Sequence, residues 1–170
     1  MKKIDIYEIP EEGLSLHLED GSWIPPDVEQ HGPVSADVHL QRTEKRVMVS
    51  GSFSVPVVHV CDRCLQEFDR VLTGTFAVDL ELLDEGGAAE QVDMDHFCHE
   101  GEMDMDFLQG SVIDIVDILQ QQVYLAMPMK KLCAEQCRGI CSGCGANLNA
   151  EPCRCEAGSD TPFAVLARLK

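Results

Sequence analysis

The sequence has few basic residues, few aromatic residues and no long apolar run. Lysine and arginine number 13 against 30 aspartate and glutamate residues, which gives a net charge of −17. Such a surface repels phosphate backbones, and the short basic runs at 42–46 and 130–131 have no interleaved aromatic side chains. The charge therefore argues against direct RNA binding and leaves two readings open, simple solubility or a basic protein partner. No apolar run approaches the length of a membrane span.

The motifs of common enzyme classes are also missing. The sequence contains no G-x-S-x-G, no P-loop and no Rossmann fingerprint, and its neighbouring carboxylates lie mostly in one acidic stretch with no pocket to tune them. We therefore expect a protein that is not an enzyme. Residues 1–8 are basic at the start but lack the apolar stretch of a signal peptide, so we expect a cytoplasmic protein with reduced thiols.

The stretch 133–155 holds six of the nine cysteines and only two large apolar residues, Ile140 and Leu148. Such a segment cannot build an apolar core and is typical of a metal site. Cys141-x-x-Cys144 followed by Gly145 has the pattern of a metal knuckle, in which glycine relieves the turn after the second thiolate. We predict one zinc ion bound by four of the six cysteines, with the knuckle pair among them; iron–sulfur chemistry stays open. The candidate ligands are Cys133, Cys137, Cys141, Cys144, Cys153 and Cys155.

A further CxxC motif, Cys61-Asp-Arg-Cys64, lies between two expected strands. A thioredoxin-type CxxC instead begins a helix, whose N-terminus lowers the thiol pKa. Half of a metal site, or a tight structural turn, is therefore favoured over catalysis. The two surplus cysteines of the C-terminal stretch could be spare, could join Cys61 and Cys64, or could form a second site.

Period-two alternation predicts strands at 34–40, 47–55 and 68–82, with Pro56 as a break or bulge before 57–60. An apolar stripe at helical spacing predicts one core helix over 111–127, with Ser111 and Asp114 as a capping box.

Between the last strand and the helix, residues 84–106 contain nine acids and no lysine or arginine, which predicts an acidic loop. Residues 161–170 predict a short amphipathic helix that docks on the body. The domains are then 1–132, a body of antiparallel sheet plus helix with the acidic loop inserted, and 133–170, the Cys-rich segment with its docking helix. The expected fold class is α+β: a curved antiparallel sheet or partly open barrel packed by one main helix, with a small C-terminal zinc-binding segment.

The order of these features resembles the YceD-like family, the large ribosomal RNA subunit accumulation proteins, from about residue 34 to the end. Its most specific elements are Cys61-Asp-Arg-Cys64-Leu65 and the C-terminal Pro-Phe-Ala-Val-Leu-Ala-x-Leu-Lys of 162–170. The resemblance implies a cytoplasmic factor that supports large-subunit ribosomal RNA, with no established enzymatic activity.

Combined with the charge, the resemblance suggests a binding factor for a basic ribosomal protein or another assembly factor, with the acidic loop 84–106 as the candidate contact. The alternative is a thiol redox or metal-delivery protein that uses Cys61, Cys64 and the C-terminal cysteines.

Overall fold

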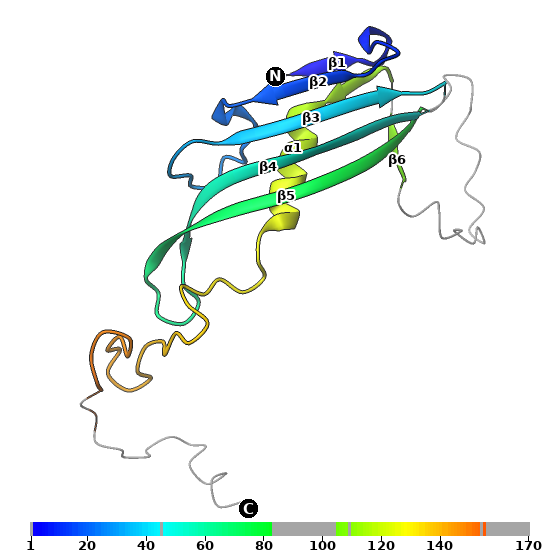
Figure 1. The fold of residues 1–170 in the computed structure, drawn as a ribbon. Coiled ribbons are helices and arrows are strands. Elements are labelled where there is room, and N and C mark those ends of the chain that lie inside the picture. The colour runs from blue at the N-terminus through cyan, green and yellow to red at the C-terminus, as the bar shows by residue number, and fades with distance from the viewer. Residues whose placement is uncertain (1, 45, 83–104, 109, 154, 156–170) are drawn as a thin grey trace, which may run out of the picture. The chain divides into compact units, whose positions relative to one another are not determined.

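Residues 2–44, 46–82, 105–108, 110–153 and 155 are described by the structure, a computed structural model. These residues form strands, two short 3-10 turns and one α-helix (Figure 1). In chain order the elements are β1 (Lys3–Asp5), η1 (Ile6–Glu8), β2 (Leu14–Leu18), η2 (Gly21–Trp23), β3 (Ser35–Arg42), β4 (Arg46–Val60), β5 (Glu67–Leu82), β6 (Met105–Leu108), β7 (Val112–Asp114) and α1 (Ile115–Ala126).

Five strands form the main sheet in the order β2-β3-β4-β5-β6. The pairs β2–β3 and β3–β4 are antiparallel, β4 and β5 form a long hairpin, and β6 joins the outer edge of β5 in parallel. β1 and β7 form a separate two-stranded antiparallel sheet. The described strands thus give the mostly antiparallel, twisted sheet that the alternation predicted, and they do not close into a barrel (Figure 1).

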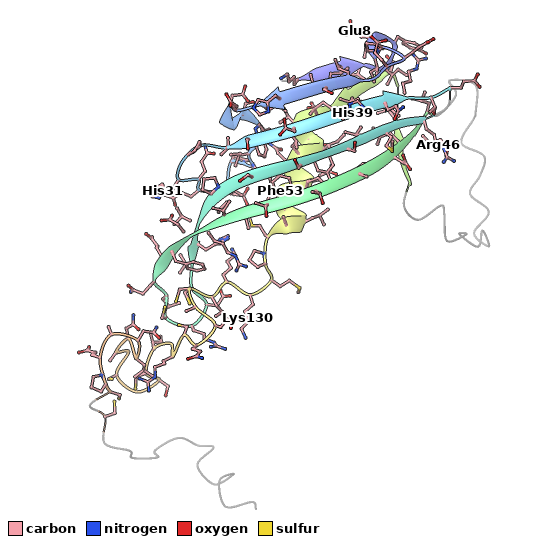
Figure 2. All side chains as sticks on the ribbon, viewed as in Figure 1. Glu8, His31, His39, Arg46, Phe53 and Lys130 are labelled. Carbon is pink, nitrogen blue, oxygen red and sulfur yellow. The ribbon has the colours of Figure 1, made fainter. Side chains whose placement is uncertain are left out.

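The core lies between the sheet and α1, which crosses one face of the sheet (Figure 1). β4 buries every second residue on this face, as its sequence pattern predicts, and α1 contributes a buried stripe at helical spacing. Trp23, from η2, is fully buried and meets the ring of Phe53 edge-on at 6.3 Å between centroids. Phe53 is labelled on the sheet in Figure 2. The buried residues of β4 and α1 are Val47, Val49, Phe53, Val55, Val57, Ile115, Leu119 and Val123.

The helix begins later than the capping pattern predicted. Residues 112–114 pair with β1 as strand β7, and Asp114, not Ser111, is the N-cap. The Asp114 carboxylate accepts hydrogen bonds from the amides of Val116 and Asp117 at 3.1 and 3.4 Å. The Ser111 hydroxyl instead donates to the carboxylate of Asp5 at 3.0 Å, a contact between residues 106 positions apart.

Two other local predictions need correction. β4 runs through Pro56 without a break, and the carbonyl of Pro56 accepts the His31 amide at 3.1 Å. Met105 and Asp106, expected at the end of the acidic loop, lie in β6, while residues 84–104 of that loop lie outside the described residues. The predicted C-terminal helix over 161–170 also lies outside them.

The chain divides into two compact units. The body unit comprises Met1–Val58 and Asp69–Pro128, and the cysteine unit comprises His59–Phe68 and Met129–Lys170. The sequence prediction placed the boundary after residue 132, whereas this division assigns the tip of the β4–β5 hairpin to the unit that holds the C-terminal cysteines. The body unit contains the main apolar core. The cysteine unit has a small cluster of its own, formed by three buried cysteines with Phe68 and Leu132.

Candidate metal centres

Eight cysteines of the cysteine unit form two groups of four, and within each group all sulfur atoms lie within 4.8 Å of one another. The first cysteine group consists of Cys61, Cys64, Cys133 and Cys137. The second cysteine group consists of Cys141, Cys144, Cys153 and Cys155. Each group offers one CxxC pair and one further pair from a different stretch of chain.

In the first cysteine group, the hairpin tip supplies one pair and the segment after α1 supplies the other. The sulfur atoms of Cys61 and Cys137 are 3.8 Å apart, and those of Cys64 and Cys133 are 3.6 Å apart. Three of the four side chains are buried, and only Cys133 is exposed.

The second cysteine group is local in sequence and more open to solvent. The sulfur of Cys141 lies 3.1 Å from that of Cys153 and 3.9 Å from that of Cys155, while Cys144 lies 3.7 Å from Cys153. Cys144 and Cys155 are exposed.

These distances fit a tetrahedral thiolate site. Four sulfur atoms at ~2.3 Å from one zinc ion lie about 3.8 Å apart. Five of the sulfur pairs lie 3.1 to 3.9 Å apart, and all pairs within a group lie within 4.8 Å. A disulfide would need about 2.05 Å, so the eight cysteines are free thiols in this structure. The donor set, four sulfurs and no oxygen or nitrogen, suits zinc and also suits an iron–sulfur cluster.

The two CxxC turns have the same backbone geometry. The amide of Leu65 donates to the carbonyl of Cys61 at 2.9 Å, and the amide of Gly145 donates to the carbonyl of Cys141 at 2.9 Å. In both turns the residue after the second cysteine has a positive φ, 57° for Leu65 and 74° for Gly145. Glycine adopts this conformation freely and leucine does not. Cys61-x-x-Cys64 is therefore a knuckle like the C-terminal one, built without the glycine that would mark it in the sequence.

Backbone and side-chain N–H groups point at the sulfur atoms of both groups. The amide of Cys133 donates to the sulfur of Cys61 at 3.4 Å, and the Asn149 side chain donates to the sulfur of Cys137 at 3.2 Å. In the second group the amide of Gly143 donates to the sulfur of Cys141 at 3.4 Å. Such donors stabilise thiolates, the form in which cysteine binds a metal.

Polar residues within the first CxxC join the hairpin tip to the segment after α1. Asp62 donates its amide to the Lys131 carbonyl at 2.8 Å, and its carboxylate accepts the Lys131 amide at 2.6 Å. The Arg63 guanidinium donates to the carbonyl of Cys137 at 2.9 Å, and the Arg63 carbonyl accepts the Ile140 amide at 3.1 Å. The sequence analysis did not predict these contacts of Asp62 and Arg63, because no local spacing relates residues about 70 positions apart.

The pKa values in the first cysteine group diverge. Burial acts to raise the pKa of the Cys61 thiol, but amide donors, that of Cys133 foremost, outweigh it and lower this pKa to about 6. The sulfur of Cys64, together with burial, raises the pKa of Cys133 to about 12.

The second cysteine group shows the same divergence. The amide of Cys144 and the sulfur of Cys153 lower the pKa of Cys141 to about 6, and the sulfur of Cys153 raises the pKa of Cys155 to about 12. Four sulfurs this close cannot all become anionic unless a cation balances their charge. A bound metal ion would supply that charge in both groups.

The six C-terminal cysteines predicted as ligands therefore separate into two sets. Cys141 and Cys144, the predicted members, lie with Cys153 and Cys155. Cys133 and Cys137 lie instead with Cys61 and Cys64, the pair for which a second site was left open.

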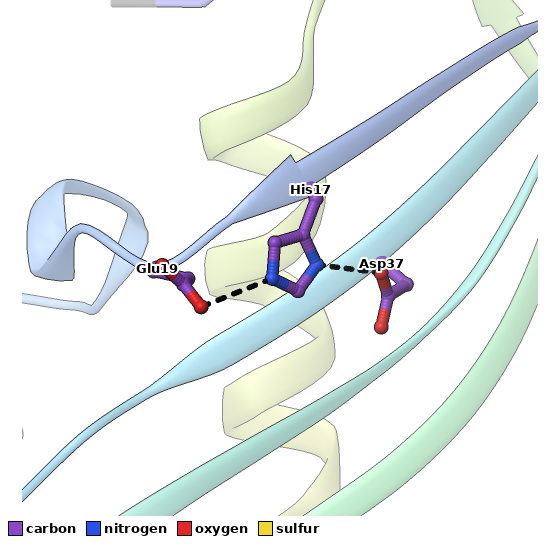
Figure 3. A network of polar contacts seen from close by, with 3 residues as sticks. All are labelled: His17, Glu19 and Asp37. Carbon is purple, nitrogen blue, oxygen red and sulfur yellow. Dashed lines mark hydrogen bonds and ion pairs between the residues drawn. The ribbon is translucent and has the colours of Figure 1, made fainter.

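A smaller polar network lies on the face of the main sheet opposite α1. His17 of β2 is bonded to the carboxylates of Asp37 at 2.6 Å and Glu19 at 3.3 Å (Figure 3). These bonds, that to Asp37 foremost, raise the pKa of His17 above its usual 6.5. The neighbouring His39 contacts the Ser15 hydroxyl at 3.0 Å. All of these side chains are exposed, so the network is a solvated cross-strand ion pair.

Among the described residues, no helix has the length and apolar character needed to cross a membrane.

A family model described as large ribosomal RNA subunit accumulation protein YceD matches residues 49–170. The chain is 29% identical over 133 residues to an uncharacterised protein of Mycobacterium leprae, covering 74% of this chain and 54% of that protein. It is 24% identical over 165 residues to a chloroplastic protein of Zea mays named large ribosomal RNA subunit accumulation protein YCED homolog 1, covering 83% of this chain and 55% of that protein. The protein of the same name from Arabidopsis thaliana is 25% identical over 156 residues, covering 81% of this chain and 49% of the relative. The chain thus spans about half the length of these three relatives, and no solved structure gives a significant match.

Proposed function

The chain belongs to the YceD family of large ribosomal RNA subunit accumulation proteins, and from this premise we propose that it supports the accumulation of large-subunit ribosomal RNA as a binding factor. The observation that carries the proposal is the extent of the family match. Residues 49–170 include most of β4, all of β5 and α1, and both cysteine groups. The family name describes the accumulation of an RNA and names no reaction, and our proposal includes no catalytic step.

We place the binding activity in the body unit and direct it at a basic protein. Of the 30 acidic residues, 24 lie in the body unit, which has only six of the 13 basic ones. This charge repels an RNA backbone and attracts a basic ribosomal protein or another assembly factor that carries basic segments. The effect on ribosomal RNA would then be indirect, through the protein that is bound. The acidic stretch 84–106, most of which lies outside the described residues, remains the proposed contact on the grounds of charge.

We assign two zinc ions, one to each cysteine group, with a structural role. Each group offers four sulfur ligands, which would complete a tetrahedral zinc site and leave no open coordination position for a substrate, as is typical of structural zinc. The metal would order a segment, residues 129–155, that has almost no apolar core of its own.

The alternative, thiol redox chemistry or metal delivery through Cys61 and Cys64, receives less support. The pKa of Cys61 is lowered as in a reactive thiol, but its side chain is completely buried and that of Cys64 is 3% exposed. A redox or delivery site needs access for a partner thiol or ligand. The cytoplasm is our proposed location, and the two plant relatives are named chloroplastic.

Two measurements test this proposal. The first compares binding of the full chain, at physiological salt, to purified basic large-subunit proteins and to ribosomal RNA fragments; we expect submicromolar binding to at least one protein and much weaker binding to RNA. Tight binding to RNA with no protein partner would refute the charge argument. The second measures metal in protein purified without chelator. We expect about two zinc ions per chain. Visible absorbance together with bound iron would show instead that the cysteines bind an iron–sulfur cluster.

A further inference from the structure

The outer edge of β5 is open along most of its length in the described part of the chain. β5 has 16 residues, and on its outer side β6 pairs only with the last four, Asp79 to Leu82. Figure 1 shows β6 as a short strand beside the far end of β5. Residues 69–78 thus present backbone N–H and C=O groups to which another strand could add.

Beneath this edge lies a groove of about 390 Å³ between the end of β5, β6 and α1. Its walls expose polar and apolar surface in similar amounts, and the side chains of Val78, Leu108 and Ile118 are half-buried there. The same side of α1 continues to Leu125, seven residues beyond Ile118, which is 77% exposed. Gln121 and Gln122 lie between these two apolar side chains, so the apolar surface of the helix is interrupted there.

The charged residues of the groove are all acidic. Asp114 and Asp117 line it, and no lysine or arginine is among its lining residues. Asp117 is exposed, and its carboxylate accepts a hydrogen bond from the neutral side chain of Gln121 at 3.1 Å. On the other face of the same strand, Asp79 and Glu81 add two more carboxylates. A guest strand would meet a groove of mixed polar and apolar lining, with carboxylates as its charged groups.

We propose that this edge and groove bind an extended, lysine- or arginine-rich peptide segment as an additional strand beside β5. The guest would pair its backbone with residues 69–78, place apolar side chains in the groove, and direct its basic side chains to Asp117 and Asp79. The inference rests on the proposed function, because it specifies which part of a basic partner is held: an extended segment that alternates apolar with basic residues. The open stretch 69–78 itself carries both Asp69 and Arg70, so the charge preference comes from the groove. The charged residues of the groove are all acidic, and a second copy of the chain would bring the same carboxylates, which favours a basic peptide over a second copy.

The experiment measures binding of a twelve-residue synthetic peptide, alternating lysine with valine or leucine, to the full chain loaded with zinc. A matched peptide has the same side chains but carries N-methyl groups on alternate backbone amides, which blocks strand pairing. We expect salt-dependent binding of the first peptide and at least tenfold weaker binding of the second. Equal binding of the two peptides would show that charge alone attracts them, and the proposal would be wrong.

Protein variants locate the site. Ile118→Lys places a positive charge in the groove, and Ser52→Lys places the same charge on an exposed position of β4 that faces away from it. We expect Ile118→Lys to weaken peptide binding at least tenfold and Ser52→Lys to leave it within twofold. Because Ile118 is half-buried, Asp117→Lys, at an exposed position, serves as a second groove variant if Ile118→Lys does not fold. Equal peptide affinities of the groove variants and the control variant would show that the peptide does not bind in the groove.

Two further outcomes are decisive. Concentration-dependent dimerisation that is lost in the groove variants would assign the edge to a second copy of the chain and overturn the proposal. With an intact basic large-subunit protein as ligand, unchanged binding by the groove variants would reject the groove while leaving the proposed function standing. If no such protein binds the wild type, the proposed function is wrong. The peptide measurements would still show whether the groove binds an extended basic segment.

Discussion

Replacing Gly145 by alanine should weaken zinc binding at the second cysteine group, and replacing Leu65 by glycine should strengthen it at the first. Both residues occupy the same knuckle position, with φ of 74° and 57°. A Cβ on Gly145 would meet nothing within 4 Å, so alanine there introduces backbone strain without a clash. Leu65 is 61% exposed and loses little packing when it is truncated.

The size of the effect follows from the backbone alone. The left-handed conformation costs an L-residue roughly 1–2 kcal/mol, and the lower backbone entropy of alanine in the unfolded chain offsets about 0.5–1 kcal/mol of this. The net change is about 1 kcal/mol in each case, opposite in sign. Because knuckle formation is coupled to metal binding, it should appear as about a fivefold change in zinc affinity.

Competition with a chromophoric chelator measures both affinities. The pair Cys141→Ser and Cys144→Ser leaves only the first group, in which Leu65→Gly is tested, and the pair Cys61→Ser and Cys64→Ser leaves only the second. Gly110→Ala is the matched control, because Gly110 has φ of 91° and open space but lies in the body unit. It should lower the stability of the body unit without changing zinc affinity. If Leu65→Gly weakens zinc binding, the equivalence of the two knuckles is wrong.

Three other predictions address the rest of the chain. Removal of metal by a strong chelator should abolish hydrogen-exchange protection around Cys133–Cys155 while the body unit keeps one cooperative unfolding transition, because the main core contains no cysteine; loss of that transition would show that the units depend on each other. Leu119→Ala should cost the body unit about 2–5 kcal/mol of unfolding free energy, because this side chain is fully buried, and denaturant titration measures the loss. His17 should titrate by NMR above 6.5, and Asp37→Asn should lower its pKa more than Glu19→Gln does, since Asp37 is the larger cause. The raised pKa means that the His17 network stabilises the fold below pH 6.5 and that this contribution disappears as the pH rises through the folded-state pKa; equal effects of the two substitutions would contradict the assignment.

The strands and the helix core were predictable because their signals are local. In β4, residues two apart share a face, so the sequence already shows which side chains are buried. The start of α1 was not predictable in this way. Ser111 has the chemistry of a cap, but its hydroxyl is bonded to Asp5, and residues 112–114 pair with β1. Contacts made across more than 100 residues overrode a local capping pattern.

The division of the cysteines shows the same limit. Spacing identifies Cys141 and Cys144 as a pair, because a knuckle is a turn of adjacent residues. Spacing cannot show that Cys133 and Cys137 lie with Cys61 and Cys64, since that grouping depends on where the β4–β5 hairpin ends and where the chain leaves α1. The first knuckle also escaped prediction. Leu65 takes the same left-handed conformation as Gly145, but a leucine does not indicate that conformation in a sequence as a glycine does.

The net charge of −17 comes from the body unit, whose six basic and 24 acidic residues give −18. The cysteine unit contains seven of the 13 basic residues but only six of the 30 acidic ones, so its side chains are close to balanced before the thiolates are counted. A tetrathiolate zinc site carries a formal charge of about −2, and two such sites would make this unit only mildly acidic. On this count, the electrostatic attraction that we propose for a basic partner would come from the body unit. The partner-binding surface that we propose therefore lies in the body unit, and the cysteine unit keeps the structural role proposed above, for which each of its two groups offers four sulfur ligands.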